Sequence, residues 1–366
     1  MIYYRDLGLI VSLYIGTLAL LLAVNFYSNK NSRGISYLFL LLIFIFFSLL
    51  VSLRPLDAGN DTIRYVTAFN HLGSVSKAYD VGKSYFGNTE FGFWRFAAMA
   101  KKVLVLPEVF IFSIGSLAFL LLCSVSRKMI ALSTSNESFY LVPMIVLCSL
   151  STYLFVYMGN HIRTSIAIPL SYLMIYYAFI DKQRIKGYLL GALAFSLHFS
   201  VILAFASKLA LSINKKSSWF CIVLASVILA KVMPAIVGML INYLPFLDAK
   251  YELYFQYNHV AEFNSIFTLT NFKVLALAGT VSLFLFNGGV CQKLFLFFFS
   301  CILLLSPVAQ VSERYFPYAF LIMFVSLYES LYFIKERHRV YLLAPIALIL
   351  FIVTVYSESA RYTLGI

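Results

Sequence analysis

Charged side chains are scarce in this sequence, and acidic ones are the scarcest. Asp, Glu, Lys and Arg make up 12% of the 366 residues, and only 15 residues are Asp or Glu. Hydrophobic residues make up 62% of the chain, and its mean hydropathy is +0.89. This balance excludes an ordinary soluble globular protein and indicates a polytopic membrane protein.

Patterns that hold metals or nucleotides are missing as well. The five cysteines lie singly within or beside apolar segments, with neither a paired pattern nor metal-ligand spacing, so we interpret them as packing residues. The sequence has no Gly-rich phosphate loop and no carboxylate cluster suited to two metal ions. We therefore expect no metal and no cofactor.

Apolar runs long enough to cross a bilayer fill most of the chain. No internal repeat, low-complexity linker or soluble domain separates them, so we predict one all-α integral membrane domain over residues 1–366. A helix needs about 20 apolar residues to span hydrocarbon, which predicts about 10–12 transmembrane helices, with a re-entrant segment as the alternative for one of them. The first run ends without a small-residue cleavage site and is interpreted as a retained span. The predicted spans are residues 7–27, 35–53, 109–126, 139–158, 163–180, 187–207, 219–241, 271–286, 293–311, 315–334 and 340–357.

The basic residues give the orientation. The net charge is +13, but Lys and Arg gather in short loops, which indicates cytoplasmic loops rather than nucleic-acid binding. Basic stretches at 182–186 and 208–216 flank the single apolar segment 187–207, yet both favour the cytoplasm. Successive loops should alternate between the two sides of the membrane, so these two basic stretches conflict with a single crossing. Either the segment dips in and returns or crosses twice with short spans, or a helix break near Pro234 restores the alternation of sides. We prefer the first solution, in which the long loop 54–108, with short helices, and the loop 244–271 both face outward.

The turn from Gly159 to Ser165 places Arg163 at the mouth of a membrane helix, with Asn160 just before it. Arg at a bilayer centre costs roughly 2.5–3.5 kcal/mol on insertion scales, and less near a helix end. Such a charge usually faces a polar cavity, where its natural ligand is an anion such as phosphate.

Two carboxylates stand out in the first outward loop. Asp61 lies between Arg54 and Arg64, and it is either the N-cap of a short helix or an ionised group that orients a sugar hydroxyl or accepts a proton. Glu90 precedes Phe91 and Trp94. Aromatic faces beside a carboxylate suit a sugar, although Trp also gathers in interfacial belts.

Two further polar residues interrupt apolar segments. His198, midway along 187–207, either bonds a neighbouring Ser or carbonyl or takes up a proton near neutral pH. Arg314 either balances the adjacent Glu313 or forms, with Arg163, a clamp for a diphosphate at two helix N-termini.

In combination, these pieces resemble the EpsG-like group of Wzy polysaccharide polymerases. The matching residues run in the family's order over most of the chain. They are Arg54, Gly59-Asn60-Asp61, Tyr65, Glu90-Phe91-Gly92, Asn160-His161-Ile162-Arg163, Ile166-Ala167, His198-Phe199-Ser200 and Arg314-Tyr315-Phe316. The family pattern often has Gln after the arginine of the fifth span, and here Thr164 stands in its place.

The resemblance implies an enzyme of the bacterial inner membrane whose active site faces the periplasm. Such a glycosyltransferase joins oligosaccharide repeat units carried on undecaprenyl diphosphate into O-antigen or a related surface polysaccharide. The growing chain leaves its lipid diphosphate and passes to a new lipid-linked unit. Expected partners are the bilayer, that lipid-linked oligosaccharide, a chain-length regulator and a flippase.

The chemistry of that reaction assigns roles to the conspicuous residues. Arginines in place at the diphosphate stabilise the charge that develops on the leaving group, and Arg163 is the first choice, with Arg314 and Arg54 as partners. Asp61 and His198 compete as acceptor of the hydroxyl proton. We expect the remaining substrate contacts from Arg64, Tyr65, Glu90 and Asn160.

Three other functions share some of these features. A lipid-linked oligosaccharide flippase also needs cavity arginines, but it should bind from both sides and often has two related halves. An O-antigen ligase uses the same donor, but usually carries a large periplasmic loop late in the chain, whereas here the longest outer loop is early. A membrane acyltransferase is a more distant alternative.

Overall fold

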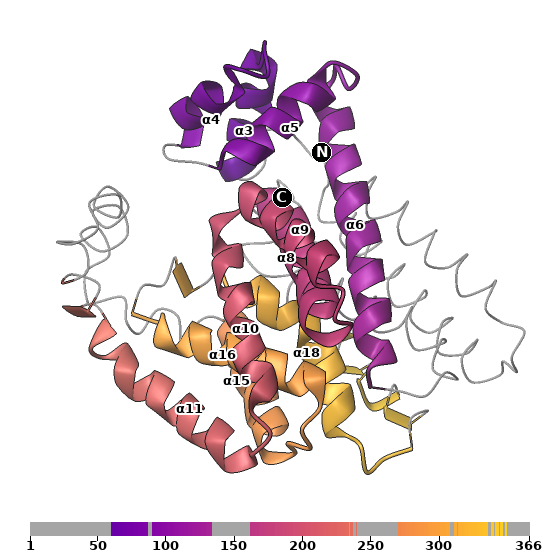
Figure 1. Cartoon of the computed structure of the whole chain (residues 1–366), viewed down its shortest axis with the longest axis vertical. Helices are drawn as coiled ribbons and strands as arrows, with labels where there is room; N and C mark the ends of the chain where they lie inside the picture. The colour runs from indigo at the N-terminus through magenta and orange to yellow at the C-terminus, as the bar shows by residue number, and fades with distance from the viewer. Residues whose placement is uncertain are drawn as a thin grey trace, which may run out of the picture. The chain divides into compact units, whose positions relative to one another are not determined.

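The structure is a computed structural model whose regular elements, among the residues it describes, are all helices (Figure 1). It describes residues 60–86, 90–133, 162–233, 270–307 and 311–335 apart from 313, with isolated positions between 235 and 349. Arg54, Asn160, residues 244–269 of the predicted loop 244–271 and the predicted spans 7–27, 35–53 and 139–158 lie outside this set, as does most of 340–357. The chain divides into two compact units, residues 1–205 with 335–366 and residues 206–334. One integrated domain stays a prediction.

The described part of the loop 54–108, which is predicted to face outward, folds into a layer of three short helices, called the loop layer here. They are α3 (Asn60–His71), α4 (Ala78–Phe86) and α5 (Phe91–Lys101), so the expected short helices are confirmed. Helix α3 begins at Asn60, which places Asp61 inside its first turn rather than before it as the N-cap. Aromatic side chains fill the interior of the layer, and Lys101 Nζ donates to the carbonyls of Asn70 and Leu72 where α3 ends, at 2.7 and 2.8 Å.

Two helices of unit 1 are long and apolar enough to cross a membrane. Helix α6 (Pro107–Ala131) begins with a proline, which is favoured there because the first N–H groups of a helix have no partner within the helix. Its last turn carries Lys128, whose positive charge interacts favourably with the negative end of the helix dipole. Helix α8 (Ile162–Ile175) continues into the π-helix η4 (Tyr176–Ile180), which together make the second candidate. Both coincide with predicted spans, 109–126 and 163–180.

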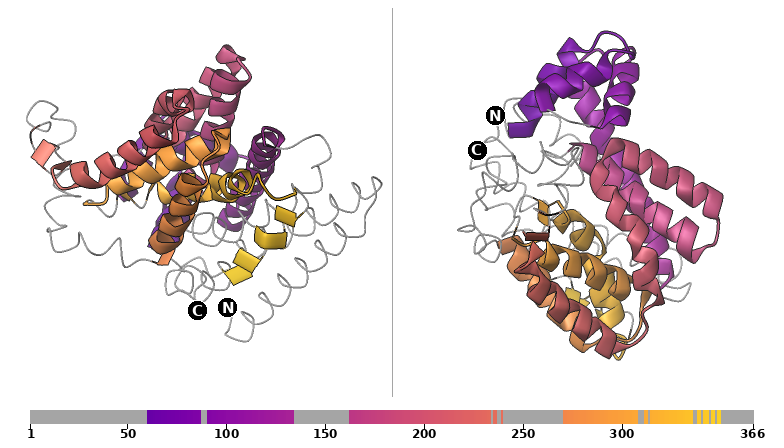
Figure 2. Two further views of the ribbon diagram at one scale, coloured as in Figure 1. Left: turned by 90° about the horizontal axis from the view of Figure 1, so that it is seen from below. Right: turned by 60° about the vertical axis from the view of Figure 1, so that its left-hand side comes forward.

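Helix α9 (Arg184–Leu197) packs back along α8, and the views in Figure 2 show the two as a pair. A stripe of small residues makes this close packing possible, because Gly187, Gly191 and Ala194 all lie buried on one face. A Cβ atom on Gly187 would lie 2.6 Å from the Cβ of Ala178 in η4. A larger side chain there would push the helices apart.

The predicted span 187–207 is two helices rather than one. After Leu197 the backbone of His198 is extended (φ −158°, ψ 125°), a short 3-10 helix η5 (Phe199–Val201) follows, and α10 (Ile202–Ser212) begins. A Cβ on Gly191 would lie 2.8 Å from Cζ of Phe205, and both residues are seven positions from His198. The chain therefore doubles back at His198, as the preferred topology requires. Which side of the membrane the ends face stays a prediction.

Unit 2 contains four apolar helices of 15 residues each among its described residues. They are α11 (Lys216–Ala230), α15 (Thr270–Phe284), α16 (Val290–Leu304) and α18 (Phe316–Ser330). Polar bonds join neighbouring helices inside the apolar packing, with Gln292 N donating to Glu329 Oε2 at 2.8 Å and the hydroxyls of Ser282 and Ser326 2.9 Å apart. Helix α11 ends four residues before Pro234, so the chain also has a break where the second topology needed one.

Candidate functional site

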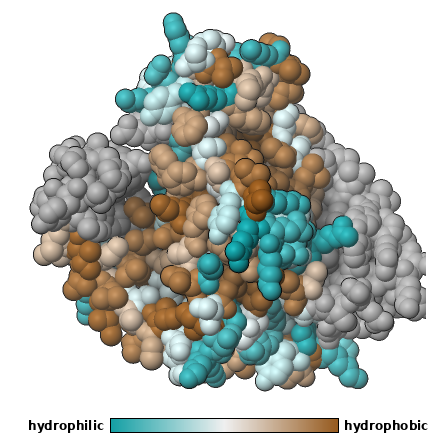
Figure 3. Space-filling view, viewed as in Figure 1, coloured by the Kyte–Doolittle hydropathy of each residue, from teal (hydrophilic) through white to brown (hydrophobic). Residues whose placement is uncertain are grey.

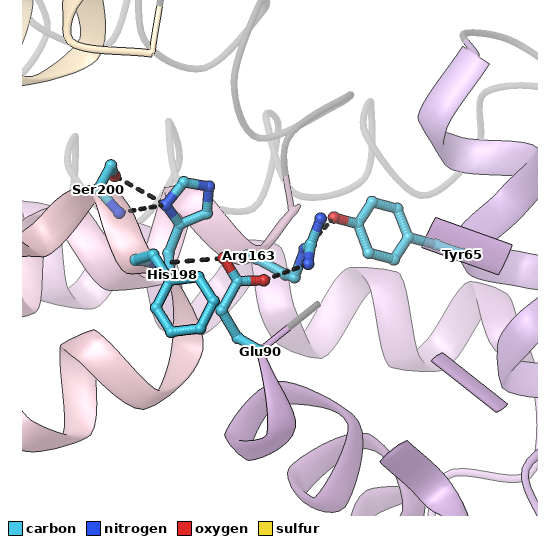
Figure 4. A network of polar contacts seen from close by, with 6 residues as sticks. Tyr65, Glu90, Arg163, His198 and Ser200 are labelled. Atoms are coloured by element: carbon cyan, nitrogen blue, oxygen red, sulfur yellow. Dashed lines mark hydrogen bonds and ion pairs between the residues drawn. The ribbon is translucent and has the colours of Figure 1, made fainter. Parts of the chain in front are cut away.

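The guanidinium of Arg163 is held by two side chains from the loop layer. Arg163 is the second residue of α8, and its Nη1 forms an ion pair with Glu90 Oε2. Its Nε donates to the hydroxyl of Tyr65 at 2.8 Å. The side chains of Arg163 and Glu90 are only 15% and 8% exposed. The expected cation at the mouth of α8 is therefore largely enclosed and already has an anionic partner (Figure 4).

Glu90 links three parts of unit 1. It stands just before α5, bonds Arg163 of α8 through one oxygen, and through Oε1 accepts the backbone N–H of Phe199 at 3.1 Å. Burial alone would raise the pKa of Glu90, but the Arg163 guanidinium and the Phe199 N–H outweigh it, so its pKa lies below 4.5. Glu90 is thus an ionised carboxylate that fastens the loop layer to the turn after α9.

The glycine two positions after Glu90 explains why α5 can come so close. A Cβ atom on Gly92 would lie 2.7 Å from the backbone carbonyl oxygen of Ser196, near the end of α9. Backbone cannot move aside as a flexible side chain can. The Glu-Phe-Gly sequence therefore combines the carboxylate with the clearance it needs to reach Phe199.

The hydrogen bonds of His198 fix the position of its ring proton. Nδ1 accepts the backbone N–H of Ser200 at 3.1 Å and lies 2.7 Å from the Ser200 hydroxyl. Because a backbone N–H can only donate, Nδ1 is an acceptor, and the proton of the neutral ring lies on Nε2. In this state His198 caps η5 with one nitrogen and is a donor at the other.

Of the two aromatic residues that follow Glu90 in the sequence, Phe91 is 50% exposed and Trp94 belongs to the interior of the loop layer. Trp94 is 1% exposed, and its ring stacks on Tyr65 with centroids 6.0 Å apart. Phe86 packs on Tyr65 at 4.7 Å, and the Arg163 guanidinium lies 5.1 Å from the Phe86 ring centroid, within cation–π range. Neither a sugar platform nor an interfacial belt describes Trp94, which is part of the core of the loop layer.

The structure brings together four of the predicted site residues and leaves the others apart or outside. Tyr65, Glu90, Arg163 and His198 form one polar row, completed by Ser200 and the Phe199 N–H (Figure 4). Arg64 is exposed on α3, and Arg314 belongs to unit 2, so its clamp with Arg163 stays a prediction. Arg54, Asn160 and the side chain of Asp61 lie outside the described residues. The bond between His198 and a neighbouring Ser, one of the two alternatives from the sequence, is present with Ser200. Sequence reasoning missed the contacts of Gly92 and Phe199.

These features define an all-helical protein with strongly apolar helices and a buried polar row at one end of the α8–α9 pair. Comparison with protein families identifies it further: residues 37–364 match the EpsG family, and the chain belongs to that family. Its members are Wzy-like polymerases. Comparison with curated proteins gave no match, and comparison with solved structures gave none either.

Proposed function

We propose that this protein is a polytopic polysaccharide polymerase of the bacterial inner membrane. Its substrate is an oligosaccharide repeat unit on undecaprenyl diphosphate, and its product is O-antigen or a related surface polysaccharide, assembled at the periplasmic face. Membership of the EpsG family and the apolar composition support this function. The observation that carries it is the row Tyr65–Arg163–Glu90 beside His198, since it fixes a cation at the end of a membrane-type helix.

Arg163 stabilises the leaving group in this proposal. As the bond between the anomeric carbon and the diphosphate oxygen breaks, its electron pair passes to the phosphate, and a cation already in position favours that transition state. Tyr65 and Glu90 hold the guanidinium in one orientation, so little reorganisation is needed when charge develops. Glu90 is then a positioning residue, rather than the sugar ligand expected from sequence.

One cation paired with a carboxylate is not enough to hold a diphosphate. The Arg163–Glu90 pair has a net charge near zero, because the pKa of Glu90 lies below its ordinary value and the carboxylate stays ionised. The remaining positive charge must come from other arginines. Arg64 is exposed on the loop layer one residue before Tyr65, and Arg54 and Arg314 are the other predicted contributors. Asn160 stays a predicted ligand for the same substrate.

The hydrogen bonding of His198 favours Asp61 as the proton acceptor. A general base needs a lone pair directed at the hydroxyl proton, but Nδ1 of His198 accepts the Ser200 N–H and Nε2 carries the proton. We assign His198 the role of a donor to a phosphate or sugar oxygen. The acceptor hydroxyl attacks the anomeric carbon, its proton passes to Asp61, and the lipid diphosphate leaves.

The test is polymer formation by the purified protein from a defined lipid-diphosphate oligosaccharide. Wild type should convert single units into a ladder of longer chains, and Arg163→Lys should lower the rate strongly while the protein remains folded. Arg95→Lys is the matched control, because Arg95 is exposed on α5 and contacts the ring of Phe91. Arg95→Lys should leave the ladder unchanged.

Other outcomes would identify other functions. Substrate that crosses the membrane of a vesicle without elongation would indicate a flippase and contradict the polymerase. Transfer that requires lipid A-core as acceptor would indicate a ligase. A normal ladder from folded Arg163→Lys and Arg163→Ala would remove the proposed role of that guanidinium.

A further inference from the structure

A second group of cations lies at the other end of the α8–α9 pair, away from Arg163. Lys128 at the end of α6 lies 4.6 Å from the ring centroid of Tyr177, and Lys186 at the start of α9 lies 3.8 Å from the same centroid. Lys128 also lies 4.5 Å from the ring centroid of Tyr176. Fourteen residues separate Arg163 from Tyr177, or about 21 Å along a helix.

Two ammonium groups that share one aromatic ring repel each other, so an anion between them would be stabilised. A positive-inside topology signal requires basic residues in the loop, but it does not require lysines from two helices to converge on one tyrosine. Tyr176 and Tyr177 lie on the π-helix η4, and such helices are frequent at functional sites. The convergence therefore exceeds what orientation alone explains.

An open hollow of about 730 Å³ lies at the start of α9, and Lys186 is one of the residues that line it. Its lining residues are Lys182, Gln183, Arg184, Ile185, Lys186, Leu189 and Leu190. Among these residues three are cationic and none is acidic. The carboxylate next to the cavity in sequence, that of Asp181, accepts a hydrogen bond from the Gln183 side chain at 2.7 Å. The surface of the hollow is mainly apolar, and the charged residues among its lining are all cationic, so a ligand with both an apolar part and an anionic group fits it.

An exposed apolar stripe leads away from the hollow. Ile185, Leu189 and Leu193 follow one another at four-residue spacing on α9, and they are 81%, 67% and 50% exposed. Figure 3 shows hydrophilic side chains gathered at the turn between α8 and α9, with hydrophobic surface beside them. A ligand that uses both surfaces must carry an anionic group and a hydrocarbon chain.

We propose that this site binds an anionic phospholipid. Its phosphate lies among Lys128, Lys186 and Arg184, and an acyl chain follows the stripe from Ile185 to Leu193. Basic pockets between helices at the cytoplasmic side of a membrane bind such headgroups. The site is separate from the polymerase site and rests only on the membrane placement of α8 and α9.

The test measures lipid retention rather than polymer formation. The full-length protein is reconstituted in nanodiscs of zwitterionic lipid with and without phosphatidylglycerol, then transferred to detergent, and its bound lipid is identified by native mass spectrometry. Each lysine should contribute about fivefold to phosphatidylglycerol affinity, so Lys128→Gln/Lys186→Gln should lower it roughly 25-fold. Lys128→Arg/Lys186→Arg keeps the charge and should retain the lipid.

The matched control removes two cations elsewhere. Lys77→Gln/Lys83→Gln changes the net charge equally, in and before α4 of the loop layer, where both lysines are exposed. Equal loss of lipid in both double variants would refute the site, since net charge would then explain binding. Glycerol phosphate should compete only weakly with phosphatidylglycerol for the site. Leu189→Asn should weaken the binding of phosphatidylglycerol without affecting the binding of glycerol phosphate. Equal competition by the soluble anion would contradict the acyl-chain contact and overturn the lipid assignment.

Discussion

Breaking the Arg163–Glu90 pair from either side should be more harmful to folding than removing both charges. Loss of one partner of a buried ion pair lowers the free energy of unfolding by about 3–5 kcal/mol, because the other charge stays buried without a partner. Replacement of both partners by uncharged residues often changes the stability little. The Arg163 side chain is still 15% exposed, so we expect Glu90→Gln or Arg163→Gln alone to lower the free energy of unfolding by about 3 kcal/mol. The amide of Glu90→Gln still accepts the Phe199 N–H, so this variant isolates the charge.

The assay is a double-mutant cycle on protein in mixed micelles, with unfolding followed by circular dichroism as the SDS fraction rises. The double variant Glu90→Gln/Arg163→Gln should recover most of the stability lost by each single variant and cost only about 1 kcal/mol, which corresponds to a coupling energy of about 5 kcal/mol. Additive losses, with no recovery in the double variant, would refute the description of this pair as a buried, mutually dependent unit.

The same cycle separates a structural arginine from a catalytic one. If Arg163 serves only to neutralise Glu90, the stable double variant should elongate the lipid-linked oligosaccharide as wild type does. We expect a folded protein that forms no ladder, because the leaving diphosphate has lost its cation. A normal ladder from the double variant would show that the enclosed ion pair is purely structural.

The pair also predicts how stability depends on pH. The pKa of Glu90 is lowered in the folded protein from its ordinary value of 4.5. Its stabilising contribution is therefore complete above about 4.5 and is lost as the pH falls through the lower, folded value. Unfolding midpoints measured through this acid range should fall more steeply for wild type than for Glu90→Gln. Parallel curves would contradict this assignment.

Three further substitutions test the surroundings. Gly92→Ala should destabilise the protein by about 1–3 kcal/mol, because the new Cβ would lie 2.7 Å from a carbonyl oxygen of α9. Gly73→Ala is the control, since the space around Gly73 is open and the free energy of unfolding should not fall. Thermal unfolding measures both variants. His198→Asn keeps an acceptor for the Ser200 N–H in η5, so the variant should fold normally but elongate polysaccharide chains slowly. A wild-type elongation rate would disprove the donor role of His198. Gly289→Ala should lower the melting temperature, because its Cβ would overlap the Glu329 carboxylate that caps α16, and Glu329→Ala should relieve that overlap.

Local patterns in the sequence predicted the elements well. Apolar runs predicted α6, α8 and the four described helices of unit 2, since helix formation in such runs depends on composition and length. Two ends were predicted wrongly, because α11 ends at Ala230 rather than 241 and α16 ends at Leu304 rather than 311. The reversal at His198 was visible only indirectly, because basic residues on both sides of one apolar segment conflicted with simple alternation. The sequence did not decide between that reversal and a break near Pro234.

The sequence singled out the residues of the polar row but not the contacts between distant parts of the chain. Tyr65, Glu90, Arg163 and His198 all stood out as polar residues in apolar surroundings. Their pairing depends on packing across 73 to 109 residues of chain, which no local pattern encodes. The burial of Trp94 was missed for the same reason, since an exposed aromatic and a core aromatic have the same sequence signature until their neighbours are known.

The order of Glu90 and Arg163 along the chain has a consequence for biogenesis. Glu90 is synthesised 73 residues ahead of Arg163, so on the proposed placement the loop layer that carries Glu90 has already been translocated when α8 emerges from the ribosome. The guanidinium then meets its counter-ion on arrival at the far leaflet. Insertion of the fifth span is thereby coupled to prior export of the loop, and a chain lacking that carboxylate should expose α8 to quality-control proteases.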